Sequence, residues 1–383
     1  MSGHFRFSTK VGQDFVGKVA MVGQRACGKT DTLHQTLTDK TGVTLYSSDD
    51  QYDGYLGAKP YPFDFSGLGR LIINDEACQP SPEHMRALLS RQGEVYNGLV
   101  LVADAVNWTF KNIAVYHAQV LADHIESDLA PVVVFVNNKN LWLKLTSPGF
   151  LDSLSEVLVE AITNLDPSSN HVYFRRQDQS ERFIKVPTEG RKIPFTTLEQ
   201  VLVNHLELWS RKEPTQVLES DYIRVFVRAL LVGLYEDKRQ KTMGTQESPL
   251  DGVLDEQLLL RLNYFSPTTL ESGLTWSAVT KGLKLASKEP LFDPSFFNTS
   301  RVKRIIEERV LASESSIETF FDTIRSLGQM SKWDVVGTAF SDSSDVEGRD
   351  TFFILMRALA QEVKKRRKYS SLSPLDDLHI TEF

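Results

Sequence analysis

Short apolar runs alternate with longer helical patterns over the first 212 residues of the chain. Because strands that are buried on both faces read as continuous apolar runs, this alternation predicts a doubly wound, mostly parallel α/β sheet with helices on both faces. The expected buried strands are residues 18–22, 98–103 and 131–136. The expected helices follow each strand or close the region, at residues 29–37, 82–89, 110–128, 150–164 and 197–209.

Two further segments complete the expected sheet. Residues 61–65 and 70–74 flank Ser66-Gly67-Leu68-Gly69, a turn sequence that predicts a hairpin. Residues 171–174 form a short apolar run. We expect this run to be the last strand of the sheet.

The pattern changes after Glu213-Pro214-Thr215, where helical segments are joined by long polar stretches. No convincing series of strands follows. The clearest helices are residues 218–237, 301–311, 316–327 and 351–368. The chain is therefore expected to hold an N-terminal extension (1–16), an α/β domain (17–212), an all-α C-terminal domain (213–368) and a flexible tail (369–383).

Composition and charge narrow the functional classes. The 383 residues carry a formal net charge of -7, which argues against a general nucleic-acid binder. No apolar run approaches the roughly 18 residues of a membrane span, and the first residues lack the apolar core of a secretory signal. Two cysteines exclude a disulfide framework. We expect a cytoplasmic protein. The basic run at 364–368 reads as the solvated end of a helix, with an anionic lipid or nucleic-acid patch as the alternative.

One motif points to definite chemistry. Residues 23–30 match G-x-x-x-x-G-K-[S/T], directly after a predicted strand and at the start of a predicted helix. In this context backbone N–H groups surround a phosphate, while Lys29 reaches the β- and γ-phosphates and the Thr30 hydroxyl binds Mg²⁺. The expected nucleotide-binding residues are Gly23, Gln24, Arg25, Ala26, Cys27, Gly28, Lys29, Thr30 and Asp31.

A Mg²⁺ site also needs a carboxylate at the end of a neighbouring strand. Asp75 ends the apolar run Leu71-Ile72-Ile73 and is the preferred ligand. Asp64 belongs to a literal D-x-x-G, but only a weak apolar run precedes it. We interpret Asp64 as a turn residue.

Over roughly residues 17–211 the sequence resembles the Ras-like GTPase superfamily. Asp75-Glu76-Ala77-Cys78-Gln79 stands where that family has D-x-A-G-Q, and Asn138-Lys139-Asn140-Leu141 stands where it has N-K-x-D. Within the superfamily the phosphate loop looks most like Rag-type GTPases, and the signal recognition particle receptor β subunit has a similar layout. The resemblance implies binding of GTP or GDP with Mg²⁺, and Asn138 and Lys139 would then flank the base.

Two residues depart from the family pattern. Leu141 replaces the acidic residue that accepts hydrogen bonds from guanine, so ATP is not excluded as the nucleotide. Asn140 is an alternative acceptor. Cys78 replaces the glycine whose N–H meets the γ-phosphate, which narrows the backbone conformations open to that loop.

The resemblance also assigns catalytic and switching roles. Gln79 would orient an attacking water while Lys29 stabilises charge on the phosphate. Glu76 is an alternative for the water, and Arg25 for charge stabilisation. The first switch would lie within residues 42–53, where Thr44, Ser47 and Ser48 are equal candidates for a second Mg²⁺ ligand.

Three hypotheses follow for function. The first is a regulatory GTPase-like switch with slow hydrolysis, which signals to a protein partner through its switch loops or its helical domain. The second is a pseudo-GTPase scaffold that holds nucleotide structurally. The third is a P-loop small-molecule kinase, whose lid would use Arg175, Arg176, Arg182 and Arg191.

Overall fold

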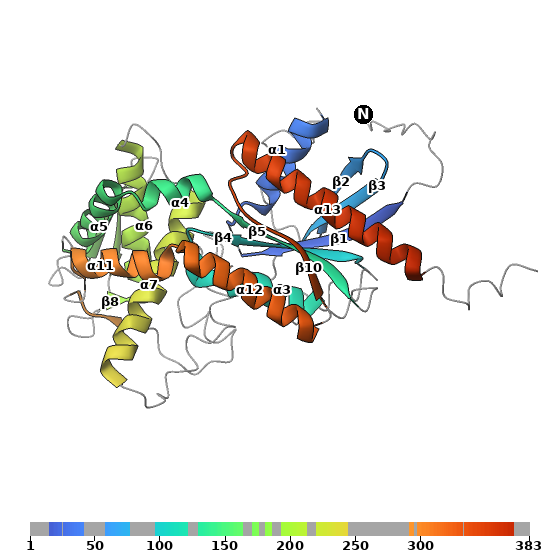
Figure 1. Cartoon of the computed structure of the whole chain (residues 1–383). Helices are drawn as coiled ribbons and strands as arrows, with labels where there is room; N and C mark the ends of the chain where they lie inside the picture. Colours follow the sequence, from blue (N-terminus) through green and yellow to red (C-terminus); the bar gives the residue numbers. More distant parts are fainter. Residues whose placement is uncertain are drawn as a thin grey trace, which may run out of the picture.

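The computed structural model describes most of the chain in twelve stretches. These are residues 15–24, 26–41, 58–76, 96–121, 129–163, 171–175, 181–185, 193–212, 220–243, 291–294, 297–331 and 333–370. Figure 1 shows them as a sheet with helices on both faces, beside a second group of helices.

The sheet has six strands in the order β10-β5-β4-β1-β3-β2. All neighbouring pairs are parallel except β2 and β3, which form an antiparallel hairpin. The strands are β1 (Val16–Gly23), β2 (Ala58–Phe65), β3 (Gly69–Glu76), β4 (Gly98–Asp104), β5 (Ala130–Asn137) and β10 (Trp333–Phe340). Since the five parallel strands share one direction, Gly23, Asp104 and Asn137 end at the same edge.

Helices cover both faces of the sheet, which explains why β4 and β5 are buried along their whole length. On one face lie α1 (Lys29–Thr41) and α13 (Val346–Ser370), and on the other lie α3 (Asn112–Leu121) and α12 (Glu314–Ser331). The α13 helix is anchored by Phe352, whose ring meets that of Phe135 edge-on with centroids 5.3 Å apart. Truncating a buried phenylalanine of this kind typically costs about 3–5 kcal/mol.

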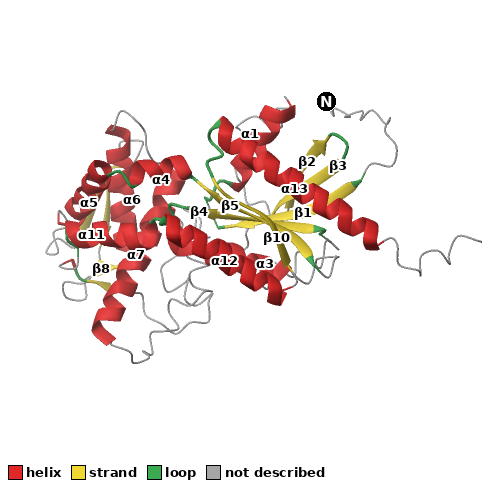
Figure 2. Ribbon diagram, viewed as in Figure 1, coloured by secondary structure: helices red, strands yellow, loops and turns green. Residues whose placement is uncertain are grey.

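The second group of helices leaves the sheet after β5 and returns before α12; we call it the helical part (residues 148–311). It contains α5 (Pro148–Thr163), α6 (Phe195–Lys212), α7 (Ser220–Met243), α11 (Thr299–Ile305) and the π-helical turn η4 (Ile306–Val310). The short helix α4 (Lys139–Leu145) leads into it. Its core is continuous with the loop after β4, where the 3₁₀ turn η1 (Trp108–Phe110) contributes Phe110. Figure 2 shows that helices make up most of the described residues of this part.

Two small antiparallel pairs lie outside the main sheet. The first joins β6 (His171–Arg175) to β7 (Glu181–Lys185), and the second joins β8 (Ile193–Pro194) to β9 (Leu291–Phe292). The expectation that residues 171–174 form the last strand of the sheet is therefore wrong, because in the described part of the chain this segment pairs with β7 and not with the six-stranded sheet.

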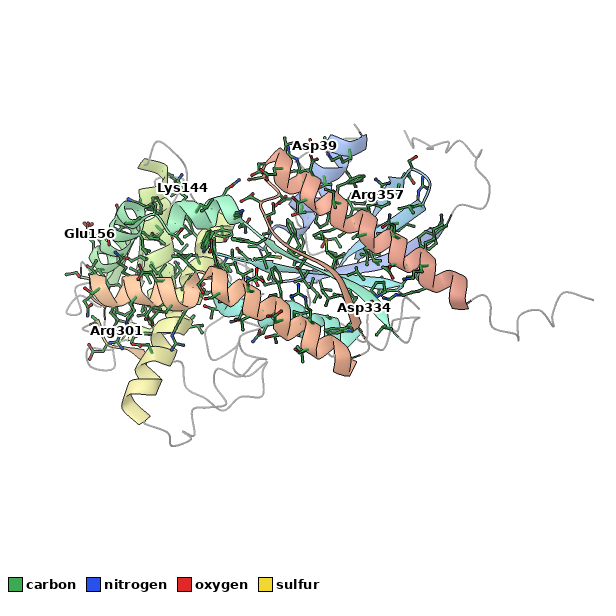
Figure 3. All side chains as sticks on the ribbon, viewed as in Figure 1. Asp39, Lys144, Glu156, Arg301, Asp334 and Arg357 are labelled. Atoms are coloured by element: carbon green, nitrogen blue, oxygen red, sulfur yellow. The ribbon has the colours of Figure 1, made fainter. Side chains whose placement is uncertain are left out.

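The expectation of an all-α C-terminal half also needs correction. Strand β10 lies in that half, and it pairs in parallel with β5 from Trp333 opposite Ala130 to Phe340 opposite Val136. An α/β domain confined to residues 17–212 would lack this edge strand, together with α12 and α13. Figure 3 shows Asp39, Asp334 and Arg357 on the sheet side, while Glu156 and Arg301 lie in the helical part.

Strand β10 was not predicted from the sequence, for a physical reason. It lies at the edge of the sheet, and most of its residues are only half-buried. Its sequence, Trp-Asp-Val-Val-Gly-Thr-Ala-Phe, therefore lacks the continuous apolar run of a central strand.

Candidate functional site

Two described residues of the loop between β1 and α1 have a left-handed backbone conformation. Ala26 and Gly28 both have positive φ, 58° and 77°. A Cβ on Gly28 would lie 2.6 Å from Nδ2 of Asn137, and one on Gly23 would lie 2.2 Å from the carbonyl oxygen of Val102. Glycine is therefore needed at both motif positions. At Gly28 any other side chain would face an unfavourable φ and a steric clash, and at Gly23 it would face a steric clash alone.

Lys29 is the first residue of α1, and its side chain folds back over the loop. Its Nζ donates to the carbonyl oxygens of Gly23 and Gln24 at 3.3 and 3.2 Å, and it lies 3.9 Å from Sγ of the buried Cys27. The positive end of the helix dipole and the ammonium group therefore lie at the same place. Both favour an anion.

Thr30 and Asp75 meet beside this loop. The Thr30 hydroxyl donates to Oδ2 of Asp75, which lies on β3 opposite Met21 of β1. Asp64 lies at the other end of the hairpin, opposite Arg70, where the two form an exposed ion pair with 2.6 Å between Nε and Oδ1. The structure thus brings Asp75 to the phosphate loop and keeps Asp64 away from it.

The donor set suits a small hard cation. A hydroxyl and a carboxylate are oxygen ligands, and Mg²⁺ commonly uses one or two such groups together with water and substrate phosphates. Within the described stretches no three His, Cys, Asp or Glu side chains gather into a metal-binding group. The protein itself would therefore supply a sparse set of ligands.

Asn137, the last residue of β5, links the phosphate loop to the C-terminal half. Its Nδ2 donates to the carbonyl oxygen of Cys27 at 3.0 Å, and its Oδ1 accepts from the N–H of Ser343 at 3.0 Å. The N-K-x-D comparison begins at the next residue, Asn138, and so does not include Asn137. The available signal was its position, directly at the end of a continuous buried run.

Asn138 and Lys139 lie next to the loop, but they point in different directions. Asn138 has a φ of 66°, and its Nδ2 donates to Oδ1 of Asp104 at 3.0 Å. Lys139 is exposed, and its Nζ lies 5.6 Å from the ring centroid of Phe340.

The next two residues, Asn140 and Leu141, have different surroundings. Leu141 packs against the core of the helical part, as Ala26 of the loop also does. Asn140 faces the segment after β10 instead, since its N–H donates to Asp342 and its Nδ2 donates to Asp345, both at 2.7 Å. This packing of a half-buried side chain explains the apolar residue at that position.

A second group of polar residues at this edge was missed by the sequence analysis. Asp104, the last residue of β4, is completely buried and accepts from the N–H of Val106, from Nδ2 of Asn107 and Asn138, and from the hydroxyl of Tyr222. Burial raises the pKa of Asp104, and these hydrogen bonds oppose the rise. Burial beside this carboxylate likewise raises the pKa of Tyr222 well above its usual value.

The remaining candidates divide between described and undescribed residues. Asp31 is exposed in the first turn of α1. Several named residues have side chains outside the described part of the chain: Arg25, Thr44, Ser47, Ser48, Glu76, Cys78, Gln79, Arg175, Arg176, Arg182 and Arg191.

The basic run at the end of α13 is partly engaged with the sheet. Lys364 donates to the carbonyl oxygens of Gly67 and Leu68 in the β2–β3 turn. Arg366 pairs with Asp334 at the start of β10. These two cations therefore fasten α13 to both edges of the sheet.

Comparison with known proteins adds no family. No protein-family model matches the chain, and no similar sequence is found among the curated proteins. In the described stretches no helix is long and apolar enough to cross a membrane. Interpretation of the site therefore rests on its geometry and its chemistry.

Proposed function

We propose that the chain binds a nucleoside triphosphate together with Mg²⁺ at residues 23–30 and acts as a GTPase-like switch. The observation that carries this proposal is the contact between Thr30 and Asp75, made beside a loop whose lysine already lies over its own carbonyl groups. A Gly-rich turn without a ligand-binding role would have no reason to place the carboxylate of Asp75 against the hydroxyl of Thr30.

Each residue would have a distinct task. The N–H groups of the loop and of the first turn of α1 would hold the phosphates, and Lys29 would balance their charge. Thr30 and Asp75 would hold Mg²⁺, which supplies neutralisation of charge on the phosphate oxygens. Asn137 would keep the loop in shape through the carbonyl of Cys27.

The base would lie beside the turn that follows β5. Because Leu141 belongs to the core of the helical part, the acceptor for guanine would come from Asn140. An ionised carboxylate has no proton to donate, so the amino group of the Asn140 side chain must face Asp345. The carbonyl oxygen of the Asn140 side chain is then left to accept hydrogen bonds from guanine. This arrangement supports GTP as the nucleotide, with ATP as the alternative.

A second candidate function is a scaffold that holds nucleotide without switching. It is favoured by the way the helical part closes on the loop, since Ala26 packs against the core of that part. A loop packed in this way would change shape little between nucleotide states. The kinase hypothesis draws no support from the described part of the chain, because the side chains of its lid arginines lie outside it.

Nucleotide binding by the purified chain tests the proposal. GTP, GDP and ATP are titrated with and without Mg²⁺ against the wild type and Lys29→Ala. We expect Lys29→Ala to weaken GTP binding about 100-fold, which corresponds to about 2.7 kcal/mol. Equal affinity in the two proteins would end the proposal.

A matched pair of aspartate variants tests the cation site. Asp75→Asn should abolish the Mg²⁺-dependent part of GTP binding, because it removes the anionic ligand next to Thr30. Asp64→Asn removes the same charge from the opposite end of the hairpin, where the exposed ion pair is worth less than about 1 kcal/mol, and should bind like the wild type. Single-turnover phosphate release above the Lys29→Ala level would then favour the switch over the scaffold.

A further inference from the structure

Asp104 joins three elements that lie far apart in the sequence. It ends β4 at the edge of the sheet where the phosphate loop lies, and it is fully buried. Its partners come from the turn that follows it, from the turn after β5 and from helix α7 of the helical part. In the described stretches all of these donors are neutral, so hydrogen bonds alone hold the buried carboxylate.

The contact with the helical part is direct and uses both carboxylate oxygens. The hydroxyl of Tyr222 lies 2.8 Å from Oδ2 and 3.0 Å from Oδ1 of Asp104, across 118 residues of sequence. Tyr222 lies in the first turn of α7. A hydroxyl placed between the two oxygens fixes the orientation of the carboxylate.

From Asp104 the network reaches the proposed nucleotide site by two routes. Oδ1 accepts from Asn138, which precedes the residues proposed to meet the base. Oδ2 accepts from Nδ2 of Asn107, and the carbonyl oxygen of Asn107 accepts from Nε2 of Gln24 at 2.9 Å. Gln24 is the second residue of the phosphate loop and is fully buried.

We propose that Tyr222 is a positioning residue for the nucleotide, which acts through Asp104 on Asn138 and Gln24 and so couples the helical part to nucleotide affinity. The inference rests on the proposed function of residues 23–30. The coupling is reciprocal by thermodynamic necessity, so bound nucleotide stabilises the docking of α7 to the same degree. A partner that engages the helical part would then alter nucleotide affinity without touching the phosphates.

Substitution of Tyr222 tests the inference against a matched control. Tyr222→Phe keeps the ring and removes the hydroxyl, and we expect Mg²⁺–GTP affinity to fall about tenfold, equivalent to about 1.4 kcal/mol. Ser155→Ala removes a buried hydroxyl of the same helical part that donates within its own helix, to the carbonyl oxygen of Leu151. This control should bind GTP within about twofold of the wild type, since it has no link to the site. Tyr222→Phe affinity equal to that of Ser155→Ala would overturn the inference.

A double-mutant cycle separates positioning from general loosening of the structure. If Tyr222 acts through Asp104, the loss of affinity in Tyr222→Phe and the loss in Asn138→Ala will not multiply in the double variant. Independent, multiplying losses would contradict the Asn138 route. Thermal unfolding of every variant establishes that it is folded at the temperature of the binding assay.

Hydrogen exchange tests the reverse direction in the wild-type chain, without reliance on a variant. Mg²⁺–GTP should slow exchange of the backbone amides in the first turns of α7, and unchanged exchange would overturn the inference. The two proposals fail differently. Wild-type affinity no better than that of Lys29→Ala refutes the nucleotide site itself, whereas normal binding by both the wild type and Tyr222→Phe refutes only the coupling.

Discussion

The carboxyl edge of the sheet and the helical part bury polar groups in opposite ways. At the sheet edge the fully buried Asp104 is held by neutral donors. In the helical part the buried charges meet opposite charges, as in the pair between Arg228 and Glu199, whose side chains are 1% and 3% exposed and 2.6 Å apart. Asp237 likewise meets Arg301 and Arg304.

The difference fits the proposal that the carboxyl edge of the sheet binds a ligand. In an ion pair the two charges compensate each other, and the pair fixes the packing of the helices that carry them. Neutral amides and hydroxyls around one carboxylate hold backbone segments in position and add no positive charge of their own. The positive charge at the sheet edge comes from Lys29 and the start of α1, where an anion would complete the site.

Loss of the buried pair should have the largest effect on stability. Arg228→Ala leaves Glu199 buried without its cation, so the free energy of unfolding should fall by about 3–5 kcal/mol. Denaturant unfolding measures this change. The double variant Arg228→Met with Glu199→Leu should recover most of the loss, because no charge remains buried. If Arg228→Ala were as stable as the wild type, the ion pair would not hold the helical part together and the contrast with the sheet edge would fail.

Acid should weaken the helical part through Asp237. Burial opposes ionisation of this carboxyl, but hydrogen bonds from Arg304 and Arg301 outweigh it and lower the pKa from 3.8 to about 2. Since the folded pKa lies below the unfolded value, this stability is present above about pH 4 and is lost as the pH falls toward 2. The contribution is about 2 kcal/mol. Denaturation between pH 6 and pH 2 should show a smaller acid-dependent loss in Asp237→Asn, and an identical loss in the two proteins would refute the assignment.

Glycine substitutions sharpen the contrast with a smaller change in stability. Gly28→Ala places a Cβ at positive φ and against Asn137, so it should cost about 1–2 kcal/mol in unfolding and also remove GTP binding. Gly149→Ala lies at the start of α5, where a Cβ meets nothing within 4 Å. It should leave binding unchanged and be neutral or slightly stabilising. Equal GTP binding and equal stability of the two variants would show that the loop does not depend on glycine at residue 28.

Local patterns were sufficient for the central strands and for the Gly-rich loop between β1 and α1. Strands β4 and β5 are buried along their whole length and β1 is buried from Val19 onward, so each contains a continuous apolar run that is easily recognised. The loop follows from the spacing of Gly23, Gly28 and Lys29. Asp75 was identified because it ends an apolar run, and the structure brings it to Thr30.

Other features of the site could not be read from neighbouring residues. Asp104 and Asn137 each end a continuous buried run, but nothing in the neighbouring residues indicates which distant elements they join. Tyr222 lies in a segment whose apolar pattern indicates nothing beyond a buried helix.

The sequence by itself determined a parallel sheet core and a Gly-rich loop with its lysine and hydroxyl, because backbone conformation and burial act over a few neighbouring residues. Only the tertiary structure decided that β10 and α13 from the far end of the chain complete the sheet, and that Tyr222 meets Asp104. Contacts between distant segments depend on how whole elements pack. No local pattern of residues records that packing.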